Sequence, residues 1–348
     1  MKPEALEHLV CPACASELEC RADESDGSEI TTGALTCSGC GSAYPIVRGV
    51  PRMNEAMDGL EGVARSFSYE WDAHHAGRLE DEETLWGLTL DEDWSYFREA
   101  TGLADEELEG MRVLDAGCGS GRLTCLVGEH GASAVIGVDI IDAVDEAFER
   151  ARDTPNVHIV QANLFRLPLR TRSFDLVWSN GVIHHTPDAR AAHAALAEMV
   201  QPGGLLYVWV YAKRFNPFRF TKDVLDALRV TRLPTPVLLR ISRAFAYVSV
   251  GLHSGYKLVR AVPPLRPRTR WAKRTMRRRT VDELSLTWLD ALSPAYDSRH
   301  SEAEVIGWFE RLGFAQIGAI EEPKVGVRGV APDASGSAGE RGPRLARP

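Results

Sequence analysis

The sequence predicts an α/β protein that is built on a mostly parallel β-sheet and preceded by a small cysteine-rich unit. Apolar runs with the length of strands alternate with helical segments from Met111 to about Ala212. Such alternation is typical of a parallel sheet that is covered by helices on both faces. A glycine-rich turn follows the first of these runs, and two C-x2-C pairs stand at 11–14 and 37–40.

Composition indicates a soluble globular protein of two or three units. The chain has 348 residues, of which 44% are apolar and 26% charged, and this supports a large core. No run approaches the roughly 18 apolar residues of a membrane-spanning helix. The opening "MKPEALEHLV" lacks the features of a signal peptide, so we expect a cytoplasmic protein.

Residues 1–53 form the first predicted unit. The pairs "CPAC" and "CSGC" are separated by 22 residues, a gap slightly longer than usual, whose "DESDGSE" segment predicts a hairpin tip between two strands. Two such pairs can present four thiolates to a tetrahedral zinc ion, and a unit this small needs a metal to hold it together. The alternative is that these cysteines are scattered core residues. The predicted structural Zn²⁺ ligands are Cys11, Cys14, Cys37 and Cys40.

The segment after the second pair, "SAYPIVRGVPRM", is typical of one protein family. It resembles the tail of small zinc-ribbon proteins related to methyltransferase activator subunits, which runs Tyr-Pro-Ile-x-x-Gly-(Val/Ile)-Pro. The matching residues are Tyr44, Pro45, Ile46, Gly49, Val50 and Pro51. The resemblance covers nearly all of residues 6–53 and implies a zinc-ribbon domain.

The core of the prediction lies in residues 111–212. Strands are expected at "MRVLDAGCG", "AVIGVDI", "VHIVQANL", "FDLVWS" and "LLYVWVYA", and helices at "RLTCLVGEHG", "AVDEAFERARD" and "DARAAHAALAEMV". Residues 54–110 read as an acidic helical extension. Residues 291–323 complete the core with a helix, begun by a capping box of Ser301 and Glu304, and a last strand. Residues 324–348 are expected to be disordered.

The glycine turn differs from a dinucleotide-binding fingerprint. Its spacing is Gly117-x-Gly119-x-Gly121, and Asp115 stands two residues before the first glycine. A pyrophosphate would not favour that carboxylate, whereas a cationic ligand would. Asp139 ends the next strand, where an acid commonly binds both hydroxyls of a ribose. These features indicate a ligand with a ribose, a positive end and no pyrophosphate. S-adenosylmethionine meets all three conditions, and we therefore set aside a nicotinamide oxidoreductase.

In this order, "VLDAGCGSGRLT", "VIGVD", "VQANLFRLP", "SFDLVWSNGVIHHTPD" and "MVQPGGLLYVWVY" resemble the class I S-adenosylmethionine-dependent methyltransferases. The resemblance implies their Rossmann-like fold with a seven-stranded, mostly parallel sheet. It implies that Asp115 and the three glycines line the methionine end of the cofactor, and that Asn180 lies beside the methyl-donor sulfur. A simple turn residue is the other reading of Asn180.

The same resemblance assigns the nucleoside end of the cofactor. Asp139 would bind the ribose, and Ile140 would lie against the adenine. Asn163 and Leu164 would contact the adenine amine, although many relatives carry Asp where this chain has Asn163. Two aromatic residues of the helical extension could close over the cofactor or belong to a packed core; these are Tyr69 and Trp71.

Methyl transfer can require a base that removes a proton from the acceptor. The candidates near the strand ends are His184, His185, Tyr211 and His300. The "HHTPD" segment also precedes a helix and contains capping residues, so one of its two histidines is expected to be structural.

A basic segment, 213–290, interrupts the core and is the predicted helical lid over the acceptor. From 213 to 280 it holds 18 Lys and Arg against two acids, a charge of +16, so the rest of a chain of net charge −9 carries −25. Our first hypothesis is an anionic small-molecule acceptor, such as a natural-product or sugar intermediate. The alternatives are an RNA methyltransferase, a lipid-like acceptor met at a membrane surface through the amphipathic stretch 237–262, and a non-catalytic scaffold or activator.

Overall fold

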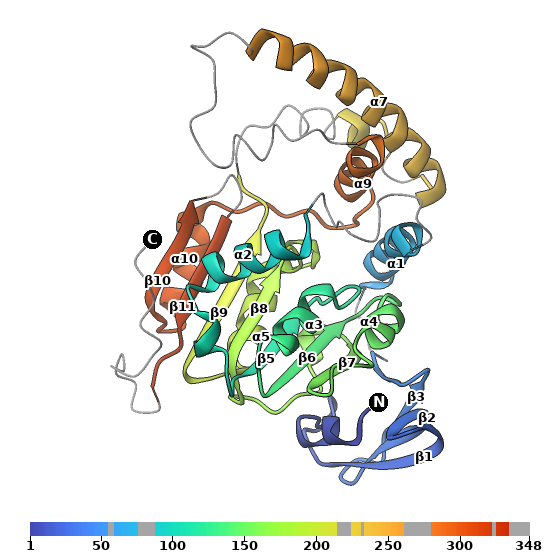
Figure 1. Cartoon of the computed structure of the whole chain (residues 1–348), viewed down its shortest axis with the longest axis vertical. Helices are drawn as coiled ribbons and strands as arrows, with labels where there is room; N and C mark the ends of the chain where they lie inside the picture. The colour runs from blue at the N-terminus through green and yellow to red at the C-terminus, as the bar shows by residue number, and fades with distance from the viewer. Residues whose placement is uncertain are drawn as a thin grey trace. The chain divides into compact units, whose positions relative to one another are not determined.

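The computed structural model describes residues 1–54, 59–75, 88–213, 224–230, 233–260, 280–321 and 325–333. The chain divides into two compact units. The first comprises residues 1–64, 93–213 and 296–348, and the second comprises 65–92 and 214–295. Figure 1 labels most of the α-helices and strands of both.

The cysteine-rich unit is a small antiparallel sheet. A short 3-10 helix, η1 (Pro3–Glu7), precedes strands β1 (Leu18–Asp26), β2 (Glu29–Cys37), β3 (Ala43–Val47) and β4 (Val50–Met53). The tip of the β1–β2 hairpin turns at Gly27, whose positive φ of 60° suits glycine. The structure thus confirms the hairpin predicted between the two cysteine pairs.

Seven of the strands that the structure describes make up the main sheet. They are β5 (Arg112–Ala116), β6 (Ala134–Asp139), β7 (Val157–Ala162), β8 (Phe174–Asn180), β9 (Val200–Val210), β10 (Ala315–Glu321) and β11 (Val325–Val330). Their order is β7-β6-β5-β8-β9-β11-β10. Strands β5 to β9 are parallel, and β11 is antiparallel to both of its neighbours. The predicted seven-stranded, mostly parallel sheet is confirmed.

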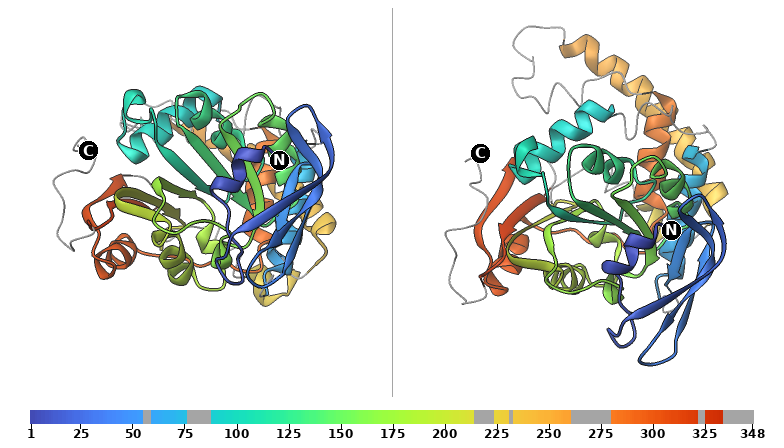
Figure 2. Two further views of the ribbon diagram at one scale, coloured as in Figure 1. Left: turned by 90° about the horizontal axis from the view of Figure 1, so that it is seen from below. Right: turned by 60° about the horizontal axis from the view of Figure 1, so that its bottom comes forward.

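Helices cover both faces of this sheet, and successive strand residues point to opposite layers. Val113 and Val135 pack in a core with helices α2 (Leu90–Thr101), α3 (Arg122–Glu129) and α4 (Val144–Arg150). Leu114 and Ile136 pack in the other core, with α5 (Ala189–Ala197) and α10 (Glu302–Arg311). Figure 2 shows the sheet between these two layers. Single 3-10 turns η2 (Asp105–Glu107), η3 (Leu164–Arg166) and η4 (Ile183–His185) complete the connections.

The predicted N-caps are present, whereas the capping box is only half formed, because the carboxylate of Glu304 contacts His300 and Lys213. Asp188 precedes α5 and accepts hydrogen bonds from the amides of Arg190 and Ala191. Ser301 precedes α10, and its hydroxyl accepts from the amide of Glu304.

The prediction of a disordered tail from residue 324 is wrong for its first part. Residues 325–330 form β11, which pairs with β9 along its whole length, from Val325 opposite Val210 to Val330 opposite Leu205. All six residues are buried, because the strand is inserted between β9 and β10. The prediction relied on the high glycine and arginine content of this segment and overlooked the closely spaced valines at 325, 327 and 330. Residues 334–348 of the predicted tail lie outside the described residues.

The cysteine-rich unit and the main sheet are joined edge to edge. Strand β4 runs parallel to β7, with Arg52 opposite Gln161 and Met53 opposite Ala162, so that eleven strands form one sheet. Beside this junction the Lys2 ammonium donates to three backbone carbonyls, those of Ala151 and Thr154 at 2.7 Å and of Val157 at 3.1 Å.

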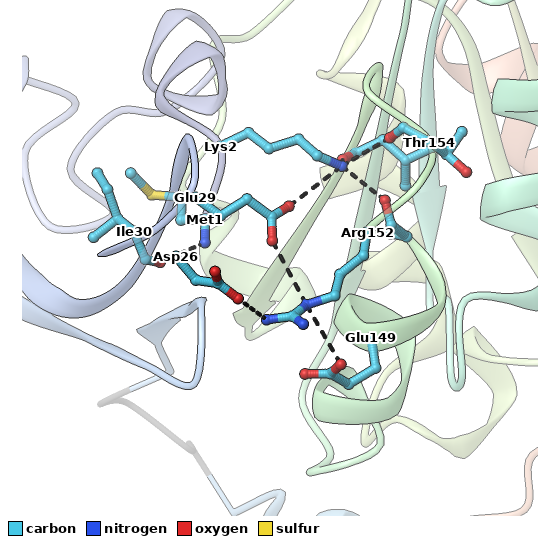
Figure 3. A network of polar contacts seen from close by, with 10 residues as sticks. Met1, Lys2, Asp26, Glu29, Ile30, Glu149, Arg152 and Thr154 are labelled. Atoms are coloured by element: carbon cyan, nitrogen blue, oxygen red, sulfur yellow. Dashed lines mark hydrogen bonds and ion pairs between the residues drawn. The ribbon is translucent and has the colours of Figure 1, made fainter. Parts of the chain in front are cut away.

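Ion pairs extend this junction. Arg152 lies 3.3 Å from Asp26 and 3.7 Å from Glu29, which belong to the hairpin strands β1 and β2 (Figure 3). The cysteine-rich unit is therefore an integral part of the first compact unit.

The second unit is helical in its described part. Helix α1 (Glu61–His75) enters it, and α7 (Thr235–Arg260) packs along α9 (Val281–Leu292). The helix expected over 237–262 is thus present. Of the basic segment, 214–223, 231–232 and 261–279 lie outside the described residues. Among the helices that the structure describes, none combines the length and apolar character needed to cross a membrane.

Candidate functional site

The glycine turn joins β5 to α3, and three of its five residues, 117–121, are glycines. Gly117, Gly119 and Gly121 have φ values of 91°, 53° and 73°, a region that residues with a side chain rarely adopt. A Cβ on Gly117 would stand 2.2 Å from a methyl group of Val182. Both the backbone conformation and the packing therefore require glycine at that position.

Two carboxylates flank this turn at the carboxyl ends of neighbouring strands. Asp115 on β5 is buried and accepts a 2.6 Å hydrogen bond from the hydroxyl of Thr124. Burial raises the pKa of Asp115 to about 7. Asp139 at the end of β6 accepts from the amide of Gly119 at 2.8 Å and from that of Ile140 at 2.7 Å. Burial raises the pKa of Asp139, while these amide bonds act in the opposite direction.

Residues predicted for the nucleoside end lie next to Asp139. Ile140 is half-buried, and its carbonyl accepts from the side-chain amide of Gln161 at 3.1 Å. Asn163 is buried and caps η3, because its side-chain oxygen accepts from the amide of Phe165 at 3.0 Å. Leu164 is buried beside it. This engagement gives Asn163 a structural function whether or not it also contacts adenine.

Asn180, at the exposed end of β8, has a neighbour that the sequence did not reveal. Tyr96 on α2 donates a 3.4 Å hydrogen bond from its hydroxyl to the Asn180 side-chain oxygen. The same hydroxyl lies 2.5 Å from that of Tyr207 on β9. Helix α2 is also fixed to the glycine turn, because Asp93 lies 3.0 Å from the guanidinium of the buried Arg122, the first residue of α3.

Three of the four candidate bases come together. The ring of His184 lies 4.0 Å from that of His185 and 4.1 Å from that of Tyr211. Both histidines are buried and Tyr211 is half-buried. The guanidinium of Arg299, which the sequence did not single out, lies 5.3 Å from the centre of the Tyr211 ring.

His300, the fourth candidate, reaches this group through its backbone. Its amide donates to the carbonyl of Tyr211 at 2.9 Å. Its ring nitrogens lie 2.9 Å from a carboxylate oxygen of Glu304 and 3.0 Å from the hydroxyl of Ser298. Both nitrogens are therefore occupied by protein groups, which favours a structural function for this ring.

Tyr69 and Trp71 belong to the second unit. Tyr69 packs there against a buried cluster of leucines, Leu238, Leu239, Leu286 and Leu289. Their closing over a cofactor stays a prediction.

The four paired cysteines converge as the sequence predicted. The Sγ atoms of Cys11, Cys14, Cys37 and Cys40 all lie within 4.8 Å of one another. Cys11 and Cys40 are 3.6 Å apart, and Cys14 and Cys37 are 3.4 Å apart. Four thiolates around Zn²⁺, each about 2.3 Å from the metal, require sulfur separations close to these. The donor set therefore fits a structural zinc ion.

Comparison with known protein families now bears directly on this geometry. Residues 114–208, which hold the glycine turn, both carboxylates and the histidine pair, match the family described as methyltransferase domain. This part of the chain is a methyltransferase domain. Residues 2–49, which hold all four cysteines, match the family described as Trm112p-like protein. Both resemblances drawn from the sequence are confirmed.

Curated relatives match the methyltransferase domain over part of their length. An uncharacterized protein of Synechococcus is 34% identical over 34% of this chain and 30% of its own. The ubiquinone biosynthesis O-methyltransferase of Rhizobium etli is 36% identical over 29% of this chain and 41% of its own. The 27-O-demethylrifamycin SV methyltransferase of Amycolatopsis mediterranei is 31% identical over 36% and 52%. The chain thus spans about half or less of the length of these relatives.

Proposed function

We propose that this chain transfers a methyl group from S-adenosylmethionine to a small-molecule acceptor. The observation that carries the proposal is the placement of Asp115 and Asp139 on either side of the glycine turn, with Gly119 hydrogen-bonded to Asp139. When bound, S-adenosylmethionine supplies an electrophilic methyl group on a cationic sulfur.

The residues of the site have distinct tasks in this proposal. Asp139 accepts hydrogen bonds from the ribose hydroxyls with the lone pairs that its amide partners leave available. Asp115 places negative charge near the cationic end of the ligand. The glycines let the backbone approach that end without interfering side chains. Asn180, held by Tyr96, lies at the edge where the acceptor would meet the methyl group.

The acceptor would lie against Tyr211, His185 and Arg299. A half-buried phenol beside a guanidinium and an imidazole can orient a polar or anionic acceptor and receive its proton. The relatives named for ubiquinone biosynthesis and for 27-O-demethylrifamycin SV support a small-molecule acceptor, of the kind we expected from the sequence. In the same proposal, Zn²⁺ on the four cysteines is structural.

Calorimetric titration of the zinc-loaded protein with S-adenosylmethionine tests the cofactor. We expect binding to the native chain, loss of binding in Asp139→Ala, retention in the surface variant Asp153→Asn, and no heat from NADH. Turnover of small-molecule acceptors at a rate independent of salt would support the acceptor class, whereas co-purifying RNA would favour an RNA methyltransferase. No binding of S-adenosylmethionine would refute the proposal and favour a scaffold or activator.

A further inference from the structure

Exposed apolar side chains are concentrated in one part of the molecule. The described residues include eight large apolar side chains that are exposed, and five of these lie between residues 224 and 248. They are Val224, Leu228, Leu233, Tyr247 and Val248. Scattered exposed apolar residues are ordinary on a protein surface, but a concentration of this kind marks an interaction surface.

On the part of α7 whose side chains the structure describes, residues 235–250, the large exposed apolar side chains lie on one face. Leu238, Leu239 and Ala246 are buried, and pack in clusters with residues of α9, beside which α7 lies in Figure 1. Tyr247 and Val248, on the opposite face, are 67% and 60% exposed. The helix therefore has one apolar face that is packed and a second that faces solvent.

The charge on α7 itself is uniformly positive, although Arg243 lies 3.5 Å from the exposed carboxylate of Asp282 on α9. Arg240 and Arg243 on α7 are exposed, and the 26-residue helix holds four Lys and Arg and no Asp or Glu. The surrounding segment 213–280 carries +16, while the rest of the chain carries −25. An anionic surface would attract this segment and repel the remainder of the chain, so it would select one orientation.

We propose that the outer face of α7, defined by Arg240, Arg243, Tyr247 and Val248, docks on an anionic lipid surface. Arginines beside a tyrosine and an aliphatic side chain suit the boundary between headgroups and acyl chains. RNA would use the cations, but it offers no partner for Val248 or Leu228. A second copy of the same face is disfavoured, because two segments of +16 repel one another. The inference does not depend on the proposed methyl transfer.

Flotation of the full-length, zinc-loaded protein with lipid vesicles tests this inference. We expect the protein to float with vesicles of phosphatidylcholine mixed with phosphatidylglycerol at low ionic strength, and not with phosphatidylcholine alone. Val248→Glu should lower the partition coefficient at least about tenfold, because it removes an aliphatic side chain that the lipid surface would cover and adds a charge that this surface repels. Arg240→Gln should lower it about fivefold.

Leu312→Glu is the matched control for Val248→Glu. Leu312 is also an exposed apolar residue, 39% exposed at the end of α10, and its replacement changes the net charge equally. Equal loss of flotation in both variants would refute the assignment to α7, and so would the absence of flotation with phosphatidylglycerol. RNA binding without vesicle binding would assign the basic segment to nucleic acid. A dimer that Val248→Glu dissociates, without vesicle binding, would assign the face to a second copy. Circular dichroism confirms that each variant is folded.

Discussion

Replacing Asp115 by asparagine would separate the cost of burying this carboxylate from its use in ligand binding. Asp115 is 6% exposed, and Thr124 donates to one of its oxygens. Asparagine has nearly the same shape and can accept the same hydrogen bond. The substitution thus removes the charge and leaves the packing of β5 in place.

The size of the effect follows from proton linkage. Burial raises the pKa of Asp115 from 3.8 to about 7, so the folded state holds this proton more tightly than the unfolded chain does. Below about pH 4 the carboxyl is protonated in both the folded and the unfolded state, and its tight proton binding in the folded state contributes fully to stability. This contribution is lost as the pH rises from there through about 7. Asparagine cannot ionise. We therefore expect Asp115→Asn to increase the free energy of unfolding by about 2 kcal/mol at pH 5 and about 4 kcal/mol at pH 8.

Urea denaturation of the ligand-free protein, followed by tryptophan fluorescence, measures this difference. Trp178 reports on the same region, because it lies opposite Asp115 on the neighbouring strand β8. The exposed control Asp153→Asn should track the native protein at every pH. If the Asp115→Asn and native curves stay parallel between pH 5 and pH 8, the carboxylate is not destabilised by burial and the reasoning fails.

Two further predictions concern the cysteines and helix α2. Chelation of the metal, or Cys37→Ser, should expose the β1–β2 hairpin to protease. Either change should also lower the Tm of the methyltransferase domain by about 5 °C, because the contacts of Lys2 are then lost. An unchanged Tm would show that the junction does not stabilise the domain. Tyr96→Phe removes the hydroxyl that holds Asn180 and should lower kcat about five- to tenfold. Tyr207→Phe keeps that bond and should retain most of the activity, and equal losses in the two variants would contradict a function for Tyr96 in positioning Asn180.

The features that the sequence predicted well are those that local chemistry determines. The φ values of the turn at Gly117 and Gly121 strongly favour glycine, and the capping side chain of Asp188 acts on amides two and three residues away. The cysteine pairs likewise place two ligands on each of two turns, so that all four come together once these two turns meet.

The residues that the sequence did not reveal act between distant segments. Tyr96 meets Asn180 across 84 positions of the chain, and no local pattern distinguishes it from the aromatic residues around it. Arg328 on β11 is buried and donates to the carbonyls of Glu99 and Ala100 at the end of α2. It lies in the segment after residue 324, whose composition had indicated a disordered tail. Only the pairing of β11 with β9 makes that contact possible, and pairing over such a separation is not visible in periodicity.

The junction of the Trm112p-like domain shows what holds two domains together when they share one chain. Two residue pairs join β4 to β7, and the carbonyl contacts of Lys2 and the ion pairs of Arg152 lie beside them. Arg48 and Arg52 also pair with Asp145, and apolar residues of the cysteine-rich unit, such as Leu9 and Ile46, share one buried cluster with Leu169 and Ile136. Separate proteins commonly need an interface of about 1,600 Å², because association costs translational and rotational freedom. Covalent linkage removes most of that cost by making docking intramolecular. Strand addition at the edge also satisfies backbone groups of β7 that would otherwise be exposed. We therefore expect that loss of the metal would disturb the candidate cofactor site through β7, because its neighbour β6 ends at Asp139.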